Sequence, residues 1–139
     1  MESMSVPAPS VSILLVEDEE AILRLLATML ARKFPGAALY TAINGRTGLE
    51  LFKSHIPDIV ITDIKMPVMG GVQMADKIRA IKPDTKFIIL TGDPGKSVHH
   101  DSVEKGFGFD HYIMKPVVFG VLFAAIEQCL AGIAQQQAK

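Results

Sequence analysis

A carboxylate directly follows an apolar, strand-like stretch near the middle of this sequence, at Asp63. The segment D-I-V-I-T-D-I-K-M-P-V-M-G-G spans residues 58–71, and its residues 59–62 have the apolar character of a buried strand. The dipeptides M-P and G-G then interrupt the chain twice. A carboxylate at the end of a buried strand either caps the next element or faces a ligand, and residues elsewhere in the chain distinguish these alternatives.

Three other apolar stretches also end in side chains that could act together with Asp63. Glu17 and Asp18 follow the first stretch, Thr91 ends another, and Lys115 follows the last. Carboxylates crowded at one site repel each other, so the grouping favours proton uptake or a hard cation, for which Mg²⁺ is the natural candidate. Lys115 would offer a positive charge to a phosphoryl oxygen and Thr91 a hydroxyl donor, which leaves Asp63 as a nucleophile that forms an acyl phosphate.

These side chains can meet only if the apolar stretches form one sheet. Five short strands are predicted, at residues 11–16, 38–42, 59–62, 87–91 and 111–114. Five helices are predicted between and after them, at residues 20–33, 45–55, 72–81, about 94–105 and 118–131. This alternation predicts an α/β fold, a five-stranded parallel sheet with helices on both faces. In the flavodoxin-like order 2-1-3-4-5, strands one and three are neighbours, and the polar strand ends converge where ligands bind in such sheets.

Each candidate residue also has an ordinary structural interpretation. Glu17 and Asp18 could be favourable acids at a helix N-terminus, and Asp63 could cap a turn. Thr91 could be a β-branched strand residue, and Lys115 a solvated charge. Their joint position at strand ends favours a functional site, because neither capping nor the helix dipole explains a lysine after a buried strand.

Composition restricts the remaining possibilities. The 139 residues suit one domain, which we place at residues 11–131, between a disordered tail at 1–10 and a polar tail at 132–139. The formal net charge is −1, so the composition gives no indication of a basic surface that would bind nucleic acid or an anionic membrane. No signal peptide or membrane-spanning run is visible, so we expect a cytoplasmic protein. Cys129 lies on an apolar helix face and is interpreted as a core residue.

Four motifs in register with these elements resemble those of receiver domains, from the response-regulator family of two-component signalling. They are I-L-L-V-E-D-E, I-V-I-T-D-I-K-M-P-V-M-G-G, I-I-L-T-G and Y-I-M-K-P, and the resemblance covers about residues 11–131. It implies a CheY-like fold. It also implies a signalling switch rather than a conventional enzyme, one that catalyses its own phosphorylation from a phosphohistidine donor and its own slow dephosphorylation.

The resemblance implies a role for each candidate residue around the metal. Asp63 matches the phosphoacceptor, and Glu17 and Asp18 match the acid pocket. The Mg²⁺ site would be completed by the backbone carbonyl of Lys65, with Asp18 as a direct ligand and Glu17 acting through water. The first acid is Glu rather than Asp, which is a common and mild departure from the family's pattern.

Three further residues match the family's switch. Thr91 and Tyr112 correspond to the switch pair, and Lys115 to the lysine that contacts the phosphoryl group. The resemblance also implies a cis peptide bond between Lys115 and Pro116. Lys65 and Asp93 should flank the approach of water to Asp63 and slow hydrolysis as a gate. Alternatively, both are merely solvated, or Asp93 caps the helix that begins at Pro94.

The implied partners are a sensor histidine kinase or a histidine phosphotransfer protein, recognised through the first helix and nearby loops. The face built from the fourth helix, fifth strand and fifth helix would signal to a downstream partner or support a homodimer. Either a stand-alone receiver or a piece of a larger regulator or hybrid kinase fits the sequence.

Three competing functions are weaker. A phosphatase of the haloacid-dehalogenase type needs a second Asp two residues after the first, where this chain has Lys65. A flavodoxin-like cofactor domain needs a Gly-, Ser- and Thr-rich first loop, whereas V-E-D-E-E would repel a phosphate. A degenerate receiver that acts only as an interaction module would not need the intact site.

The adjacent His99 and His100 point about 100 degrees apart on a helix, so they do not suit one metal ion.

Overall fold

The computed structural model describes residues 11–92 and 108–138, and within them the chain forms a five-stranded sheet. The strands, all parallel, lie in the order β2-β1-β3-β4-β5. Their bounds are β1 Ser12–Val16, β2 Ala38–Ala42, β3 Ile59–Asp63, β4 Lys86–Thr91 and β5 His111–Met114. The predicted flavodoxin-like topology is therefore confirmed, because β2 lies on one side of β1 and the later strands lie on the other, which makes β1 and β3 neighbours.

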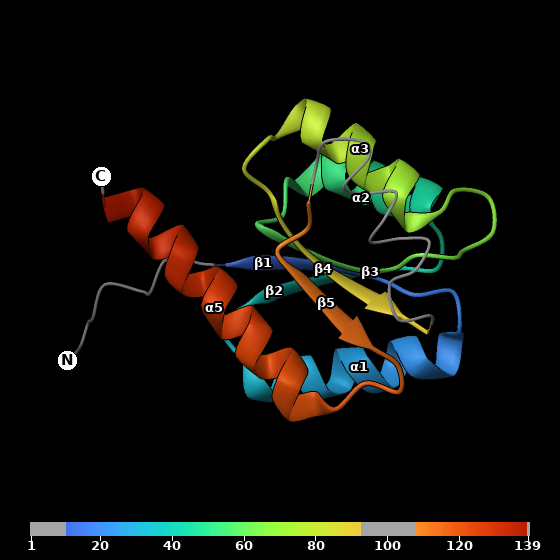
Figure 1. Cartoon of the computed structure of the whole chain (residues 1–139), viewed down its shortest axis with the longest axis horizontal. Helices are drawn as coiled ribbons and strands as arrows, with labels where there is room; N and C mark the ends of the chain where they lie inside the picture. Colours follow the sequence, from blue (N-terminus) through green and yellow to red (C-terminus); the bar gives the residue numbers. More distant parts are fainter. Residues whose placement is uncertain (1–10, 93–107, 139) are drawn as a thin grey trace.

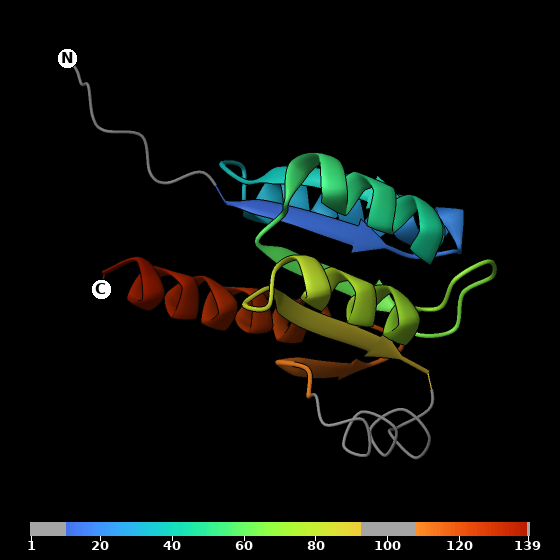
Figure 2. The same cartoon turned by 90° about the horizontal axis from the view of Figure 1, so that it is seen from above.

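Helices cover both faces of this sheet (Figure 1 and Figure 2). One face carries α1 and α5, and the other carries α2 and α3. Their bounds are α1 Glu20–Lys33, α2 Gly45–His55, α3 Gly71–Ile81 and α5 Phe119–Ala138. The helix predicted at about residues 94–105 lies outside the described residues, as does the predicted tail at 1–10. None of the described helices is both long and apolar enough to cross a membrane.

Two hydrophobic cores hold the helices to the sheet, one on each face. Because strand side chains alternate between faces, Leu15 and Ile61 point toward α1 and α5, while Leu14 and Val60 point toward α2 and α3. All four are fully buried. This explains why β1, β3 and β4 read as continuous apolar runs rather than alternating ones. Cys129 is buried in the α1 and α5 core, as expected.

The largest boundary difference is at the C-terminal helix. Sequence reasoning ended this helix at Ala131, but α5 continues to Ala138 and so includes most of the predicted polar tail. Alanine and glutamine are good helix formers, and no proline interrupts the segment, so polarity alone does not end the helix. Two smaller differences lie next to the site: β3 includes Asp63, and α3 begins one residue early, at Gly71.

Candidate functional site

The sheet register brings the polar strand ends to one edge. Val16 pairs with Thr62 across β1 and β3, so the residues that follow them, Glu17 and Asp63, lie side by side. Thr91 ends β4 and pairs with Met114, the last residue of β5. Lys115 follows directly, and its amide N–H donates a hydrogen bond to the Thr91 carbonyl at 2.8 Å.

Lys115 joins two carboxylates. Its Nζ lies 2.8 Å from Asp63 Oδ2 and 3.0 Å from Glu17 Oε1. The Glu17 side chain is fully buried, that of Asp63 is 12% exposed and that of Lys115 is 20% exposed. The predicted cis peptide bond between Lys115 and Pro116 is present. The lysine therefore reaches the phosphoacceptor candidate from a strand two positions away in the sheet.

Backbone groups fix the orientation of both carboxylates. Asp63 Oδ1 accepts a hydrogen bond from the Ile64 amide at 2.8 Å, and Glu17 Oε2 accepts one from the Glu19 amide at 3.0 Å. The Thr62 hydroxyl donates to the Asp63 carbonyl at 2.8 Å, which leaves the side chain of Asp63 as the part that faces the site. Charge-assisted bonds of this kind are short and directional, so neither carboxylate can rotate freely.

The acid cluster has the donor set of a hard cation site. Glu17, Asp18 and Asp63 each offer a carboxylate oxygen, and the three atoms lie within 4.8 Å of one another. Asp18 is exposed to solvent while the other two are buried. The buried Oε1 of Glu17 has the ammonium as an ion-pair partner but accepts no well-directed hydrogen bond from the described residues. This site fits Mg²⁺, because it offers oxygen ligands and is open to solvent at Asp18. Its three carboxylates also carry more negative charge than the single Lys115 ammonium neutralises.

At both Glu17 and Lys115, burial and ion pairing shift the pKa value in opposite directions. Burial raises the pKa of Glu17, because lost hydration outweighs the stabilising Glu19 amide and Lys115 ammonium. Burial alone would lower the pKa of Lys115, but its contacts with Asp63 and Glu17 outweigh burial and raise that pKa. The ammonium therefore stays charged, while Glu17 holds its charge at a cost that a bound cation would offset.

The two switch candidates lie on one face of the sheet. Tyr112 pairs with Ile89, two residues before Thr91, so both side chains point toward α3. Thr91 is buried, and the half-buried Tyr112 ring meets Phe109 edge-on at 5.9 Å. The Phe109 amide donates a hydrogen bond to the Tyr112 hydroxyl oxygen at 3.4 Å. In this structure Tyr112 therefore packs beside Phe109 near the start of β5.

Other predicted residues have less definite positions. The Lys65 side chain is exposed, in the loop between β3 and α3 that follows Asp63. Asp93, its proposed gate partner, lies outside the described residues, as do His99 and His100. Sequence reasoning missed Gly71, where a Cβ atom would overlap the Asp63 carbonyl oxygen. The G-G dipeptide after the phosphoacceptor candidate was the signal that could have identified this close approach.

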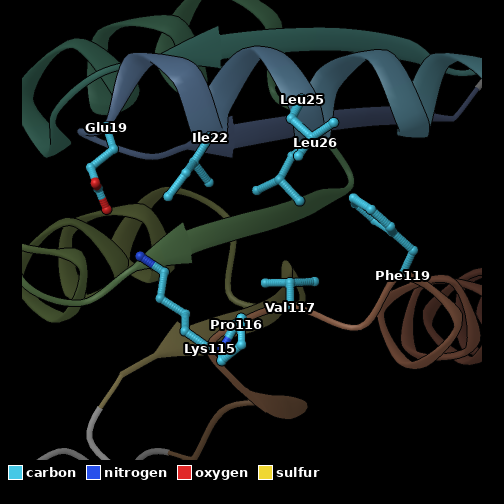
Figure 3. Close-up of a pocket in the computed structure, with 8 residues that line it drawn as sticks. All are labelled: Glu19, Ile22, Leu25, Leu26, Lys115, Pro116, Val117 and Phe119. Carbon is cyan, nitrogen blue, oxygen red and sulfur yellow. The ribbon is translucent and has the colours of Figure 1, made fainter.

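A groove of about 460 Å³ lies beside Lys115, between α1 and the loop that connects β5 to α5 (Figure 3). Apolar side chains line most of it, and the charged Glu19 and Lys115 lie toward one end. The lining residues are Glu19, Ile22, Leu25, Leu26, Lys115, Pro116, Val117 and Phe119. Leu25 is 53% exposed, so the groove presents apolar surface to solvent next to the site.

Comparison with known proteins identifies the class to which this fold and site belong. The profile of the response regulator receiver domain matches residues 13–127, and the chain belongs to that family. A receiver domain is a signalling switch of a two-component system rather than a conventional enzyme, and it implies a cognate histidine kinase. The cluster of Glu17, Asp18 and Asp63 is consistent with the phosphoaspartate site of such a domain.

Particular relatives agree with this assignment. The chain is 34% identical over 125 residues to the uncharacterized transcriptional regulatory protein YesN of Bacillus subtilis, covering 89% of this chain and 33% of YesN. A CheY-like receiver domain from Methanospirillum hungatei is 29% identical with a TM-score of 0.82, covering 92% of this chain and 99% of that one. The match thus covers nearly all of the solved receiver domain from Methanospirillum hungatei but only a third of YesN.

One solved relative bears on the metal. Thermotoga maritima TrrA, 34% identical with a TM-score of 0.74, was solved in complex with Mg²⁺-BeF, and the match covers 86% of this chain and 98% of that one. Receiver domains therefore bind Mg²⁺, and this chain carries an acidic triad of suitable chemistry.

Proposed function

We propose that this domain accepts a phosphoryl group on Asp63 from a phosphohistidine donor. The observation that carries the proposal is the Lys115 ammonium, held 2.8 Å from Asp63 Oδ2 inside a cluster of acids. A carboxylate oxygen of Asp63 would attack the phosphorus, forming the O–P bond as the N–P bond of the donor breaks and the imidazole leaves. Lys115 would then pair with a phosphoryl oxygen and replace the contact that it makes with Asp63.

Four groups would hold Mg²⁺. Asp18 and Asp63 are the proposed direct carboxylate ligands, Glu17 acts through water, and the Lys65 backbone carbonyl completes the protein's ligand set. Bound Mg²⁺ would supply positive charge that neutralises the phosphoryl oxygens. The chain's own contribution is orientation, because backbone amides already hold the carboxylates of Asp63 and Glu17.

Thr91 and Tyr112 would report the modification. A phosphoryl group on Asp63 gives the Thr91 hydroxyl a new acceptor, and movement of Thr91 leaves space into which the Tyr112 ring can turn, away from Phe109. The face formed by the fourth helix, β5 and α5 would change with it and bind a downstream partner or a second copy of the domain. The exposed apolar side chains of Met114 on β5 and Val121 on α5 would belong to this face.

The cytoplasmic donor, a histidine kinase or a histidine phosphotransfer protein, would dock on the groove beside Lys115. Its apolar lining offers a seat for a helix of the partner, and the phosphohistidine at the edge of that helix would face Asp63. Substituting the exposed Leu25 with Asp should slow transfer from the kinase but leave phosphorylation by acetyl phosphate unchanged, because only the first reaction uses the groove.

The central test is phosphorylation with acetyl phosphate and Mg²⁺, followed by intact-mass measurement. Wild-type protein should gain one phosphoryl group, Asp63→Asn should gain none, and EDTA should prevent the reaction. Asp18→Ala should lose Mg²⁺ binding in a calorimetric titration. Labelling of the Asp63→Asn protein at the wild-type level would disprove the assignment.

A further inference from the structure

The loop that connects β3, which ends in Asp63, to α3 contains an unusual turn. The Met69 amide donates to the Pro67 carbonyl at 2.7 Å, and Val68 between them has a φ of 71°. An i to i+2 bond around a residue with positive φ is a γ-turn, which is rare and strained, and especially so for a β-branched residue. The Val68 side chain is 72% exposed, so burial of this side chain does not explain the conformation.

Contacts at both ends hold this turn. At its base, the Gly71 amide donates to the Ile64 carbonyl at 2.8 Å and closes the loop. On its far side, the Gly45 amide at the start of α2 donates to the Met69 carbonyl at 3.0 Å. Lys65 lies between these two attachment points. The second contact joins α2, which carries none of the proposed site residues, to the loop that carries one of them.

Only glycine fits at position 45. A Cβ atom there would overlap the Met69 carbonyl oxygen and would also lie 3.0 Å from its carbon and 3.1 Å from the Met69 Cβ. Helix geometry does not require glycine, because Gly45 does not have a positive φ and alanine is the better helix former. Asn44 supplies the cap of α2 independently, since its Oδ1 accepts a hydrogen bond from the Thr47 amide at 2.9 Å. The requirement for glycine therefore arises from the loop, not from the helix.

We propose that Gly45 is a positioning residue for the Mg²⁺ site: its backbone holds the Met69 carbonyl and thereby sets the path of residues 64–70 that presents the Lys65 carbonyl to the metal. This inference rests on the proposed function. Gly45→Ala pushes the Met69 carbonyl away and displaces the loop, while Asp63 and the acids after β1 stay in place. Since outer-shell partners affect metal affinity strongly, we expect Mg²⁺ to bind about tenfold more weakly.

The test is calorimetric titration of the full chain with Mg²⁺, with melting temperatures measured in EDTA. Two controls separate positioning from stability. Gly36→Ala adds a Cβ with no atom within 4 Å and should bind Mg²⁺ like wild type. Asn44→Ala removes the helix cap and should lower the melting temperature, yet it should leave Mg²⁺ affinity unchanged because it adds nothing at Met69.

Three results would overturn the inference. They are unchanged Mg²⁺ affinity in Gly45→Ala, an equal loss of affinity in Asn44→Ala at similar melting temperature, and a wild-type protein that does not bind Mg²⁺. Only the last also removes the proposed function. If Gly45→Ala fails to fold, the inference is tested instead by measuring amide hydrogen exchange of the wild-type protein with and without Mg²⁺. Mg²⁺ should slow exchange at Gly45 but not at Gly36, and equal rates at Gly45 with and without Mg²⁺ would overturn the inference.

Discussion

Replacing Lys115 by Met tests whether one ammonium balances the acids of the site. The substitution keeps the length of the side chain and removes its charge, so Glu17 and Asp63 lose contacts of 3.0 and 2.8 Å. Without Mg²⁺ the site then holds three carboxylates, counting Asp18, and no ion-pair partner from position 115. The domain should become less stable at neutral pH.

The expected loss follows from the burial of the partners. Removing one member of a buried ion pair costs about 3 to 5 kcal/mol, because the remaining charge stays buried and unpaired. Glu17 is fully buried, whereas the Lys115 side chain keeps 20% of its surface in solvent. We therefore expect the lower end of that range, about 3 kcal/mol of unfolding free energy at pH 7.5 in EDTA.

The loss should depend on protons and on metal. Burial already raises the pKa of Glu17, and removal of the ammonium raises it further. At pH 5 the carboxylates of the variant can take up a proton, so its deficit should shrink. Saturating Mg²⁺ should also reduce the deficit, because a bound cation neutralises the same charges and stabilises the folded state by mass action.

The assay is urea unfolding followed by circular dichroism, since the chain has no tryptophan. Lys77→Met is the matched control, because this exposed lysine lies on the surface of α3 and its loss should change stability by no more than about 0.5 kcal/mol. The reasoning is refuted if Lys115→Met is as stable as Lys77→Met at pH 7.5 in EDTA. It is also refuted if the stability deficit of Lys115→Met at pH 7.5 in EDTA does not shrink at pH 5 or with saturating Mg²⁺.

Three further changes have definite expected outcomes. Because burial raises the pKa of Glu17 above its ordinary 4.5, its stabilising contribution is fully present below that value and is lost as the pH rises through the folded pKa. Wild type should therefore lose stability relative to Glu17→Gln in EDTA as the pH rises above 4.5, and parallel urea midpoints would contradict this. Gly71→Ala should lower the melting temperature and prevent phosphorylation of Asp63, since the new Cβ overlaps the Asp63 carbonyl oxygen, whereas Gly36→Ala should do neither. Arg79→Leu should destabilise the domain by about 1 kcal/mol in urea, because its guanidinium lies over two aromatic rings at 5.0 and 5.2 Å; an unchanged midpoint would show that those contacts contribute nothing.

Local patterns in the sequence determined the elements of this fold. The strands at 38–42 and 111–114 and the helices at 20–33 and 45–55 have the bounds predicted for them, because apolar periodicity and turn residues act within a few positions of the chain. The same patterns predicted a parallel sheet with helices on both faces, and the order 2-1-3-4-5 was adopted as one of the few arrangements that such a sheet allows. They also identified the acids and the lysine at strand ends as candidates.

Local patterns did not determine how far α5 continues or what the site residues contact. The helix extends past Ala131 because nothing in the polar segment breaks it, and a change in polarity is not a helix stop. The resemblance placed Lys115 against the phosphoryl group on Asp63, but its contact with the fully buried Glu17 was not foreseen.

The tertiary structure alone decided the contacts that join distant parts of the chain. Lys115 and Asp63 are 52 positions apart, and their 2.8 Å contact depends on the register of β3, β4 and β5 together. The glycine at position 45 looked like an ordinary helix start, yet its backbone meets Met69 across a loop. Such contacts depend on how whole elements pack against each other, so the spacing of residues along one element does not predict them.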